Sequence, residues 1–505
     1  MVEALQNLLA GFNIALSLEN LVFALIGCTL GTLIGVLPGI GPAAGVAILI
    51  PITFQLPATG AIIMLAAIYY GTMYGGTITS VLVNVPGETT SVATCFDGYP
   101  MAKNGRGGVA LSIAAIGSFI GATVSIFVLV FAAPPLARFA LRFGPPEFFG
   151  LMLMGLSLVI GLAGKSMTKA LMMGALGLLL SMVGMDPAQG VPRFSFGQTE
   201  LLGGLNLVPV VMGLFGIADI LASAETQFRP VFDTRVSSLI PTRKDWKDSA
   251  GPIARGTALG IFLGIIPGMQ PSVATFMTYV AEKKISKYPE KFGTGVIEGV
   301  AAPETANNAF VNAALIPLFT LGIPTTPTLA VLTGALMMNG LVPGPTLFKD
   351  HPDFVWAVIA SLYIGNVILL VLNLPLIGMW VKILQIPYSI LFALILLFTF
   401  VGAYSVNNSA FDVGVMVVIG VVAYLLKKLD FPLAPIVLTM VLGPLLETAL
   451  RNTLQMSQGN LTILISRPIA AIFLLAAASI FLFPMFRQVV SLIRARKPRD
   501  LGADS

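Results

Sequence analysis

The sequence predicts an all-α membrane protein that crosses the bilayer many times, and three observations support this fold class. Its 505 residues are 56% hydrophobic and only 10% charged, with a mean hydropathy of +0.92, a composition suited to lipid rather than water. Apolar runs near the ~20 residues that cross a bilayer recur from Leu18 to Val490, which leaves room for roughly 10 to 14 membrane segments. These runs are apolar on every face, whereas the strands of a transmembrane barrel alternate polar and apolar residues, so helices are expected throughout.

The placement of basic residues predicts the orientation of the chain. The net charge is +5, but Lys and Arg are scattered through short loops instead of lining one face, which argues against a nucleic-acid partner. No Lys or Arg precedes Lys103, whereas the C-terminus carries Arg494, Arg496, Lys497 and Arg499. The positive-inside rule therefore places the N-terminus outside the cell and the C-terminus in the cytoplasm.

A polar stretch divides the chain into two halves. Residues 1–222 form a first membrane repeat, residues 253–490 a second one, and residues 491–505 a basic cytoplasmic tail. Between the halves, residues 223–252 read as a cytoplasmic linker because basic side chains are concentrated there. These side chains are Arg229, Arg235, Arg243, Lys244 and Lys247.

The two halves share a Gly/Pro pattern. Residues 31–42 read GTLIGVLPGIGP and residues 260–271 read GIFLGIIPGMQP. The shared pairs are Gly31/Gly260, Gly35/Gly264, Pro38/Pro267, Gly39/Gly268 and Pro42/Pro271. Each segment is followed by a second interruption, VNVPGETTS around Pro86 and LGIPTTPTL around Pro324, so the order of parts is the same in both halves.

Charges in the loops predict that the repeat is inverted. The second-half interruption at Pro267 is followed by four lysines, whereas the equivalent first-half residues, 43–70, contain no charge. The lysines are Lys283, Lys284, Lys287 and Lys291. Corresponding loops on opposite sides of the membrane define an inverted repeat of the kind that many secondary transporters contain.

Segment length predicts re-entrant hairpins at the first interruptions. Only about 26 residues separate the basic residues that end near Arg255 from those that begin at Lys283, and two full crossings need ~40. We therefore expect residues around Pro267 to enter the membrane, break and return, and residues around Pro38 to do the same from the other side. A kinked helix that crosses once is the alternative.

The interruptions are the candidate substrate site. Breaks free backbone N–H and C=O groups inside lipid, which is tolerated where protein, water or a ligand satisfies them. Half-helix N-termini suit carboxylates, while carbonyl, amide and hydroxyl oxygens suit a small cation. The candidate binding residues are Pro38, Gly39, Gly41, Pro42, Asn84, Pro86, Gly87, Glu88, Thr89, Thr90, Ser91, Pro267, Gly268, Gln270, Pro271, Glu304, Thr305, Asn307, Asn308, Gly322, Pro324, Thr325 and Thr326. Asn84, Thr89, Asn308 and Thr325 are the candidate neighbours of a Na⁺ ion.

Several motifs resemble the large membrane subunit of the tripartite tricarboxylate transporter family. They are GVLPGIGP (35–42), YGTMYGGTITSVLVNVPGETTS (70–91), DGYPMAKNGRGG (97–108), GIIPGMQP (264–271), APETANNA (302–309) and IPLFTLGIPTTPT (316–328). One departure is Thr325, where this family is expected to have glycine.

The resemblance implies secondary uptake of a di- or tricarboxylate such as citrate across a bacterial inner membrane, with the N-terminus in the periplasm. It also implies two protein partners, a periplasmic solute-binding protein and a small transmembrane subunit. Moving an anion inward against an inside-negative potential costs ~2.3 kcal/mol per charge per 100 mV, so coupling to Na⁺ or H⁺ is expected. The scarcity of Lys, Arg and His in the apolar segments favours Na⁺, although Glu88 or Glu304 offers a site for a proton.

Other charged residues have simpler interpretations. Asp219 and Glu447 are expected at helix ends or beside structural partners, and Asp97 and Lys103 in a solvated loop. With a single histidine, His351, the chain has no conventional metal cluster or serine triad, so no cofactor and no enzymatic activity are expected. An anion channel, and less so an intramembrane enzyme, are the alternatives.

Overall fold

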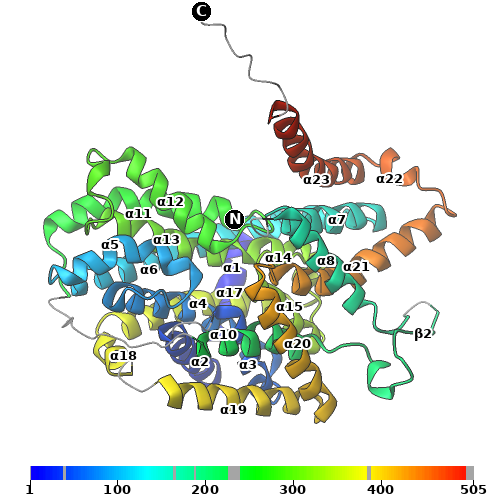
Figure 1. Ribbon diagram of the computed structural model, residues 1–505, viewed down its shortest axis with the longest axis horizontal. Helices are drawn as coiled ribbons and strands as arrows, with labels where there is room; N and C mark the ends of the chain where they lie inside the picture. The colour runs from blue at the N-terminus through cyan, green and yellow to red at the C-terminus, as the bar shows by residue number, and fades with distance from the viewer. Residues whose placement is uncertain are drawn as a thin grey trace, which may run out of the picture.

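A computed structural model describes residues 2–37, 41–162, 166–186, 189–225, 239–383 and 388–495, and these are almost entirely helical (Figure 1). Within this part of the chain, six helices are long and apolar enough to cross a membrane: α2 (Leu18–Val36), α4 (Ala58–Val83), α6 (Gly107–Ala140), α17 (Pro352–Asn373), α20 (Ala410–Lys428) and α21 (Ala434–Met456). The predicted all-α polytopic fold class is confirmed.

The remaining elements complete the chain. The other α-helices are α1 (Val2–Ala15), α3 (Pro42–Thr53), α5 (Val92–Lys103), α7 (Pro145–Leu162), α8 (Met167–Ser181), α9 (Leu207–Val211), α10 (Ala218–Ala224), α11 (Arg243–Gly264), α12 (Pro271–Ile285), α13 (Glu298–Ala313), α14 (Leu315–Leu321), α15 (Pro327–Met338), α16 (Pro345–Asp350), α18 (Ile377–Ile383), α19 (Tyr388–Asn407), α22 (Ile463–Ser466) and α23 (Pro468–Ala495). Short 3₁₀ turns η1 (Thr89–Ser91), η2 (Thr199–Leu201) and η4 (Pro289–Lys291), the π-helix η3 (Met212–Ile217) and strands β1 (Gly184–Met185) and β2 (Pro192–Arg193) lie between them.

Parts of the predicted linker and tail lie outside the described residues, which exclude 226–238 and 496–505. The C-terminal part of the predicted linker is helical. Helix α11 begins at Arg243 because Thr242 and Asp245 form a capping box, in which the Thr242 hydroxyl accepts from the Asp245 N–H at 3.2 Å. Residues 243–252 therefore belong to α11.

Helices α2 and α4 lie side by side and point the same way. Three glycines on α2 each face a carbonyl oxygen of α4, so close that a Cβ would lie 2.2–2.4 Å from that oxygen. The pairs are Gly27 with Met64, Gly31 with Ile68 and Gly35 with Thr72. Residue numbers rise together along both helices, which makes the pair parallel. The chain between them, which contains α3, must therefore turn back.

Helices α11 and α13 repeat this arrangement in the second half. Gly256 faces the carbonyl of Ala302, Gly260 that of Ala306 and Gly264 that of Phe310, with a Cβ placed 2.4–2.6 Å from each oxygen. This pair is also parallel, and α12 lies in the returning chain between its members. The Gly/Pro pattern found in the sequence thus corresponds to two helix pairs built alike.

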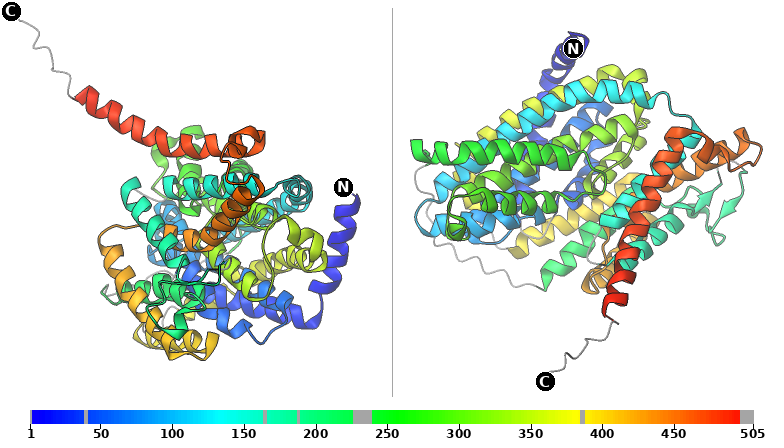
Figure 2. Two further views of the ribbon diagram at one scale, coloured as in Figure 1. Left: turned by 90° about the vertical axis from the view of Figure 1, so that its right-hand side faces the viewer. Right: turned by 90° about the horizontal axis from the view of Figure 1, so that it is seen from above.

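The helices of the two Gly/Pro repeats occupy different parts of the molecule. In Figure 1, α11, α12 and α13 lie together with α5 and α6 on the left, while α2 and α3 lie below the centre. Helices α7, α8, α21 and α23 form a third group, on the right. Figure 2 shows α23 leaving this group, so that its second half projects from the body of the molecule.

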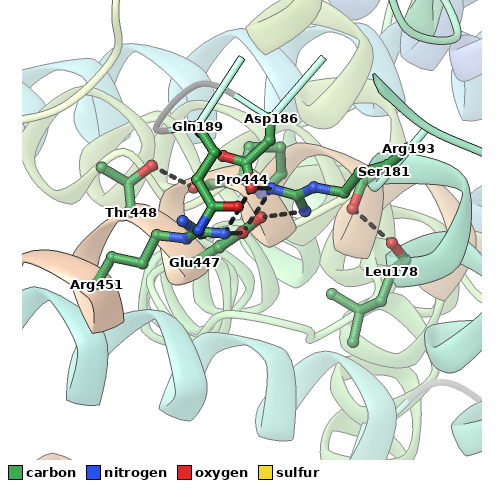
Figure 3. Close-up of polar contacts among 9 residues, drawn as sticks. All are labelled: Leu178, Ser181, Asp186, Gln189, Arg193, Pro444, Glu447, Thr448 and Arg451. Carbon is green, nitrogen blue, oxygen red and sulfur yellow. Dashed lines mark hydrogen bonds and ion pairs between the residues drawn. The ribbon is translucent and has the colours of Figure 1, made fainter. Parts of the chain in front are cut away.

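A network of ion pairs fixes the short β-hairpin to α21 (Figure 3). Arg193 of β2 lies 2.7 Å from Asp186 and 3.0 Å from Glu447, measured between guanidinium nitrogen and carboxylate oxygen. Arg451, one turn after Glu447 on α21, lies 2.8 Å from Glu447 and 2.9 Å from Asp186. Because two guanidinium groups share two carboxylates, the network is more robust than an isolated surface pair. The structural role predicted for Glu447 is confirmed.

The prediction that Asp97 lies in a solvated loop is wrong. Its carboxylate is fully buried and accepts the Tyr279 hydroxyl at 2.8 Å. It also accepts three backbone N–H groups at 2.8–2.9 Å, those of Gly293, Gly295 and Val296. Asp97 therefore organises the turn between η4 and α13, a role that requires partners almost 200 residues away along the chain. Lys103 is exposed, as expected.

Replacement of a glycine at either helix pair should destabilise the protein. Gly31→Ala and Gly260→Ala each place a methyl group against a backbone carbonyl that cannot move aside, which should cost about 1–3 kcal/mol. Gly414→Ala is the matched control, because a Cβ at this α20 position meets open space. Thermal unfolding of the detergent-purified protein measures the effect. Equal midpoints for all three variants would contradict the close packing described above.

Candidate functional site

The helix N-termini at three of the interruptions converge on one cavity of about 420 Å³. The helices are α3, which begins at Pro42, α12, which begins at Pro271, and α15, which begins at Pro327. Proline suits the first helical position because its φ angle is already helical and it lacks an N–H that would otherwise be unpaired. The first two prolines are equivalent positions of the repeat, so the sequence pattern brings equivalent ends to the same cavity.

These helix ends offer N–H groups to a ligand. The N-cap residues of α3 and α12, Gly41 and Gln270, make no side-chain hydrogen bond to their own helices. At α15, by contrast, the Thr326 hydroxyl accepts from the Leu329 N–H at 3.2 Å. A helix N-terminus carries a partial positive charge and unpaired N–H groups, which together favour an anion. The cavity is therefore suited to carboxylates.

The fourth interruption contributes Glu88, Thr89 and Thr90 to the cavity wall. The Glu88 side chain is buried, and its Oε1 atom accepts from the Thr90 hydroxyl and from Asn307 Nδ2, the latter at 3.4 Å. Its Oε2 atom is also buried and has no hydrogen-bond partner among the described residues. An oxygen in this state is unsatisfied until a proton, a cation or water binds it.

Glu304 lies on α13, three residues before Asn307, and is almost completely buried. Both carboxylate oxygens accept hydroxyl groups, Oε2 that of Thr77 on α4 at 2.6 Å and Oε1 that of Thr94 on α5. In the described part of the chain, neither Glu304 nor Glu88 forms an ion pair with a basic side chain. The junction between the halves thus contains two buried carboxyl groups with hydroxyl and amide partners only.

The predicted binding residues separate into three groups. Those that line the cavity are Gly41, Pro42, Glu88, Thr89, Thr90, Gln270, Pro271 and Thr326. Those that lie elsewhere or shape the interruptions are Asn84, Pro86, Gly87, Ser91, Pro267, Gly268, Glu304, Thr305, Asn307, Asn308, Gly322, Pro324 and Thr325. Pro38 and Gly39 fall outside the described residues.

Packing explains several residues that lie away from the cavity. Gly87 fits against the Gly35 carbonyl, with no room for a Cβ, and Thr305 faces two glycines of α6. Gly268 and Gly322 adopt positive φ angles of 80° and 72°, which glycine accepts without strain. These residues allow the chain to break and pack rather than contact a ligand.

The four residues expected around Na⁺ are not gathered at the cavity. Only Thr89 lines it; Asn84 is an exposed left-handed residue at the end of α4. The Asn308 amide instead donates to Ser118 of α6 at 2.8 Å. Thr325 is buried, and its hydroxyl oxygen has no partner among the described residues. Glu88 Oε2 and the amide oxygen of Asn307 are likewise buried and have no partner among the described residues.

Sequence reasoning missed part of the cavity wall. Residues not predicted as ligands include Tyr69, Met73, Phe215, Asp219, Ser272, Lys427 and Phe431. Tyr69 and Met73 lie within the apolar run of α4, where nothing in the sequence distinguishes them from core residues. Asp219 and Lys427 stand at helix ends, which is why they look structural. Only the tertiary fold brings them to the Gly/Pro interruptions.

Comparison with known families decides the identity of the chain. Residues 21–438 match the family model described as "Tripartite tricarboxylate transporter TctA family". The chain belongs to the TctA family. It is therefore a membrane component of a tripartite tricarboxylate transporter, and the resemblance seen in its motifs is confirmed.

Two relatives of this TctA-family protein come from Agrobacterium vitis. It is 47% identical over 491 residues to the "Uncharacterized 52.8 kDa protein in TAR-I ttuC' 3'region", an alignment that covers 96% of this chain and 98% of the relative. It is 48% identical over 212 residues to the "Uncharacterized protein in TAR-II ttuC' 3'region", which covers 42% of this chain and 88% of that protein. No solved structure matches the chain.

Removal of the Glu304 carboxylate should destabilise this TctA-family protein. Glu304→Ala leaves the Thr77 and Thr94 hydroxyls without their acceptor and creates a cavity, at a combined cost of about 2–5 kcal/mol. Glu200→Ala, at an exposed position, is the control. The midpoint of thermal unfolding in detergent measures both. An unchanged midpoint for Glu304→Ala would show that the hydroxyl partners find other acceptors.

Proposed function

We propose that this protein takes up a di- or tricarboxylate across the inner membrane by coupling it to an inward flow of Na⁺ or H⁺. Substrate reaches it from a periplasmic binding protein, and a small transmembrane subunit completes the transporter. The observation that carries the proposal is the convergence of the α3, α12 and α15 N-termini on one cavity. Family membership supports the class of transporter, and the chemistry of the cavity supports a carboxylate substrate.

The cavity has the size and polarity for a small organic acid. Its volume of about 420 Å³ lies within the range of ligand pockets in proteins. Apolar side chains such as Met73, Phe215 and Phe431 cover much of the wall, and their low polarity strengthens the attraction between carboxylate and helix N-terminus. Hydroxyl groups at Thr89 and other wall residues add hydrogen-bond donors that fix the orientation of the ligand.

The parallel helix pairs support a transporter architecture. Because α2 runs parallel to α4, and α11 parallel to α13, each intervening chain has to return to the side it came from. We infer that α2–α3 and α11–α12 are re-entrant hairpins, which enter the membrane from opposite sides as an inverted repeat. Basic residues flank only the second hairpin, so that hairpin enters from the cytoplasm, with the N-terminus of the chain in the periplasm.

A coupling cation has a binding place close to the substrate cavity. Unpartnered oxygens occur on Glu88, Asn307 and Thr325, all buried, and a Na⁺ ion or a proton on Glu88 would satisfy at least one of them. Binding of the cation also neutralises the carboxylate that would otherwise repel an anionic substrate. Cation and substrate therefore bind more favourably together than alone, which is the condition for symport.

Transport in reconstituted vesicles tests the proposal. Proteoliposomes that contain the large subunit, its small subunit and the binding protein should accumulate labelled citrate or a dicarboxylate under an inward Na⁺ or pH gradient. Glu88→Gln removes the charged oxygen and should lower uptake by about tenfold or more, with Glu200→Gln as an exposed control. Unitary currents without saturation would instead show a channel, and uptake that ignores both gradients would exclude symport.

A further inference from the structure

One ion pair lies in the wall of the substrate cavity. Lys427, at the end of α20, and Asp219, in α10, both line the cavity, with 2.6 Å between Nζ and Oδ1. The Asp219 side chain is 15% exposed and that of Lys427 is 49% exposed, so the ammonium group is the more accessible partner. Lys427 is the one positively charged side chain among the described residues of the cavity wall.

A second ion pair, outside the cavity, joins α20 to the residue that follows α10. Lys428 lies 2.6 Å from Glu225, and the Tyr424 hydroxyl also donates to this carboxylate. Neither Lys428 nor Glu225 lines the cavity. The π-helix η3, which leads directly into α10, also packs closely on α20, where Gly213 faces the Met416 carbonyl. Attachment of α10 to α20 therefore does not depend on the Asp219–Lys427 pair.

The backbone before Asp219 has an unusual conformation. The π-helix η3 ends at Ile217, two residues before Asp219, and its Phe215 also lines the cavity. A π-helical turn has a poorer hydrogen-bond geometry than an α-helix and frequently lies at functional sites. Here it places an acidic side chain against the cavity, at the position of the only cation in the described wall.

We propose that Lys427 forms a carboxylate subsite, in which a substrate carboxylate replaces Asp219 as the partner of the ammonium group. The inference rests on the proposed function, since it adds a residue to the same site. Helix N-termini supply only about half a charge each, so a substrate with two or three carboxylates needs a further positive charge. Lysine is suited to such an exchange because its ammonium group is a mobile point charge rather than a rigid fork.

Asp219 then sets how readily the substrate leaves. While the site is empty, Asp219 satisfies Lys427; when the substrate binds, it competes for the same ammonium group. The competition weakens binding and promotes release of the substrate. A free lysine would hold a multiply charged anion too tightly for rapid turnover, and a cavity without lysine would hold it too weakly.

The two partners should therefore have opposite effects on affinity. Asp219→Asn frees Lys427 and should lower the Kd for citrate by about tenfold, with slower transport at saturation, whereas Lys427→Gln should raise the Kd by about tenfold. If the pair served only to hold α10 against α20, both variants would weaken binding alike. In that case the charge reversal Asp219→Lys/Lys427→Asp, which re-forms the ion pair, would restore citrate binding.

Citrate binding to the purified full-length chain in lipid nanodiscs, measured by calorimetry, tests the inference. Glu225→Gln and Lys428→Gln are the matched controls, because they break the neighbouring pair outside the cavity, and should leave the Kd unchanged. If Lys427→Gln proves unstable, Lys427→Arg is the substitute variant. It keeps the positive charge and should therefore retain citrate binding. Losses of affinity in both Asp219→Asn and Lys427→Gln would overturn this inference but not the proposed carboxylate substrate. Failure of the wild-type chain to bind citrate, succinate or malate would overturn the carboxylate substrate itself, and this inference with it.

Discussion

The structure depends on one constraint, that a backbone N–H or C=O group surrounded by lipid must find a partner within the protein or a ligand. Helix interruptions at Pro42, Pro271 and Pro327 break this rule locally, so they have to lie inside the fold. Two parallel helix pairs, α2 with α4 and α11 with α13, flank the first two of these interruptions inside the fold. Their glycines allow the backbones to approach within van der Waals distance, and the chain that returns between the members of each pair contains α3 or α12. The unpaired N–H groups then face a common cavity, where an anion can satisfy them.

Much of this arrangement could be predicted from the sequence because its determinants are local. Proline at a first helical position, and glycines every four residues, carry their structural meaning wherever they occur, and they occur twice in the same order. The pattern therefore indicates which segments meet, and Gly41, Gln270 and Thr326 are among the predicted residues that line the cavity. Composition, together with the length of the apolar runs and the absence of strand-like alternation in them, predicts the all-helical fold class.

The remaining features depend on contacts between distant residues, which no local pattern encodes. Asp97 looks like a loop residue until its three backbone partners and Tyr279 are seen to surround it. Asn308 looks like a ligand in a polar motif, yet its amide is used by Ser118 of α6. Lys427 follows an apolar helix, as lysines at membrane boundaries commonly do, and only the fold shows that its ammonium group faces the cavity.

Charge balance connects these observations to transport. A carrier has to bind a multiply charged anion and also release it, so the attraction must be strong enough for selectivity and weak enough for turnover. Helix N-termini meet this condition because their charge is partial, and a lysine held by an aspartate meets it because the net charge of the pair is zero. Glu88 adds a negative charge to the same wall when it is ionised, and a bound cation removes it. An empty cavity without the cation therefore disfavours the substrate, so under the proposed coupling the uptake of the anion is conditional on binding of the cation.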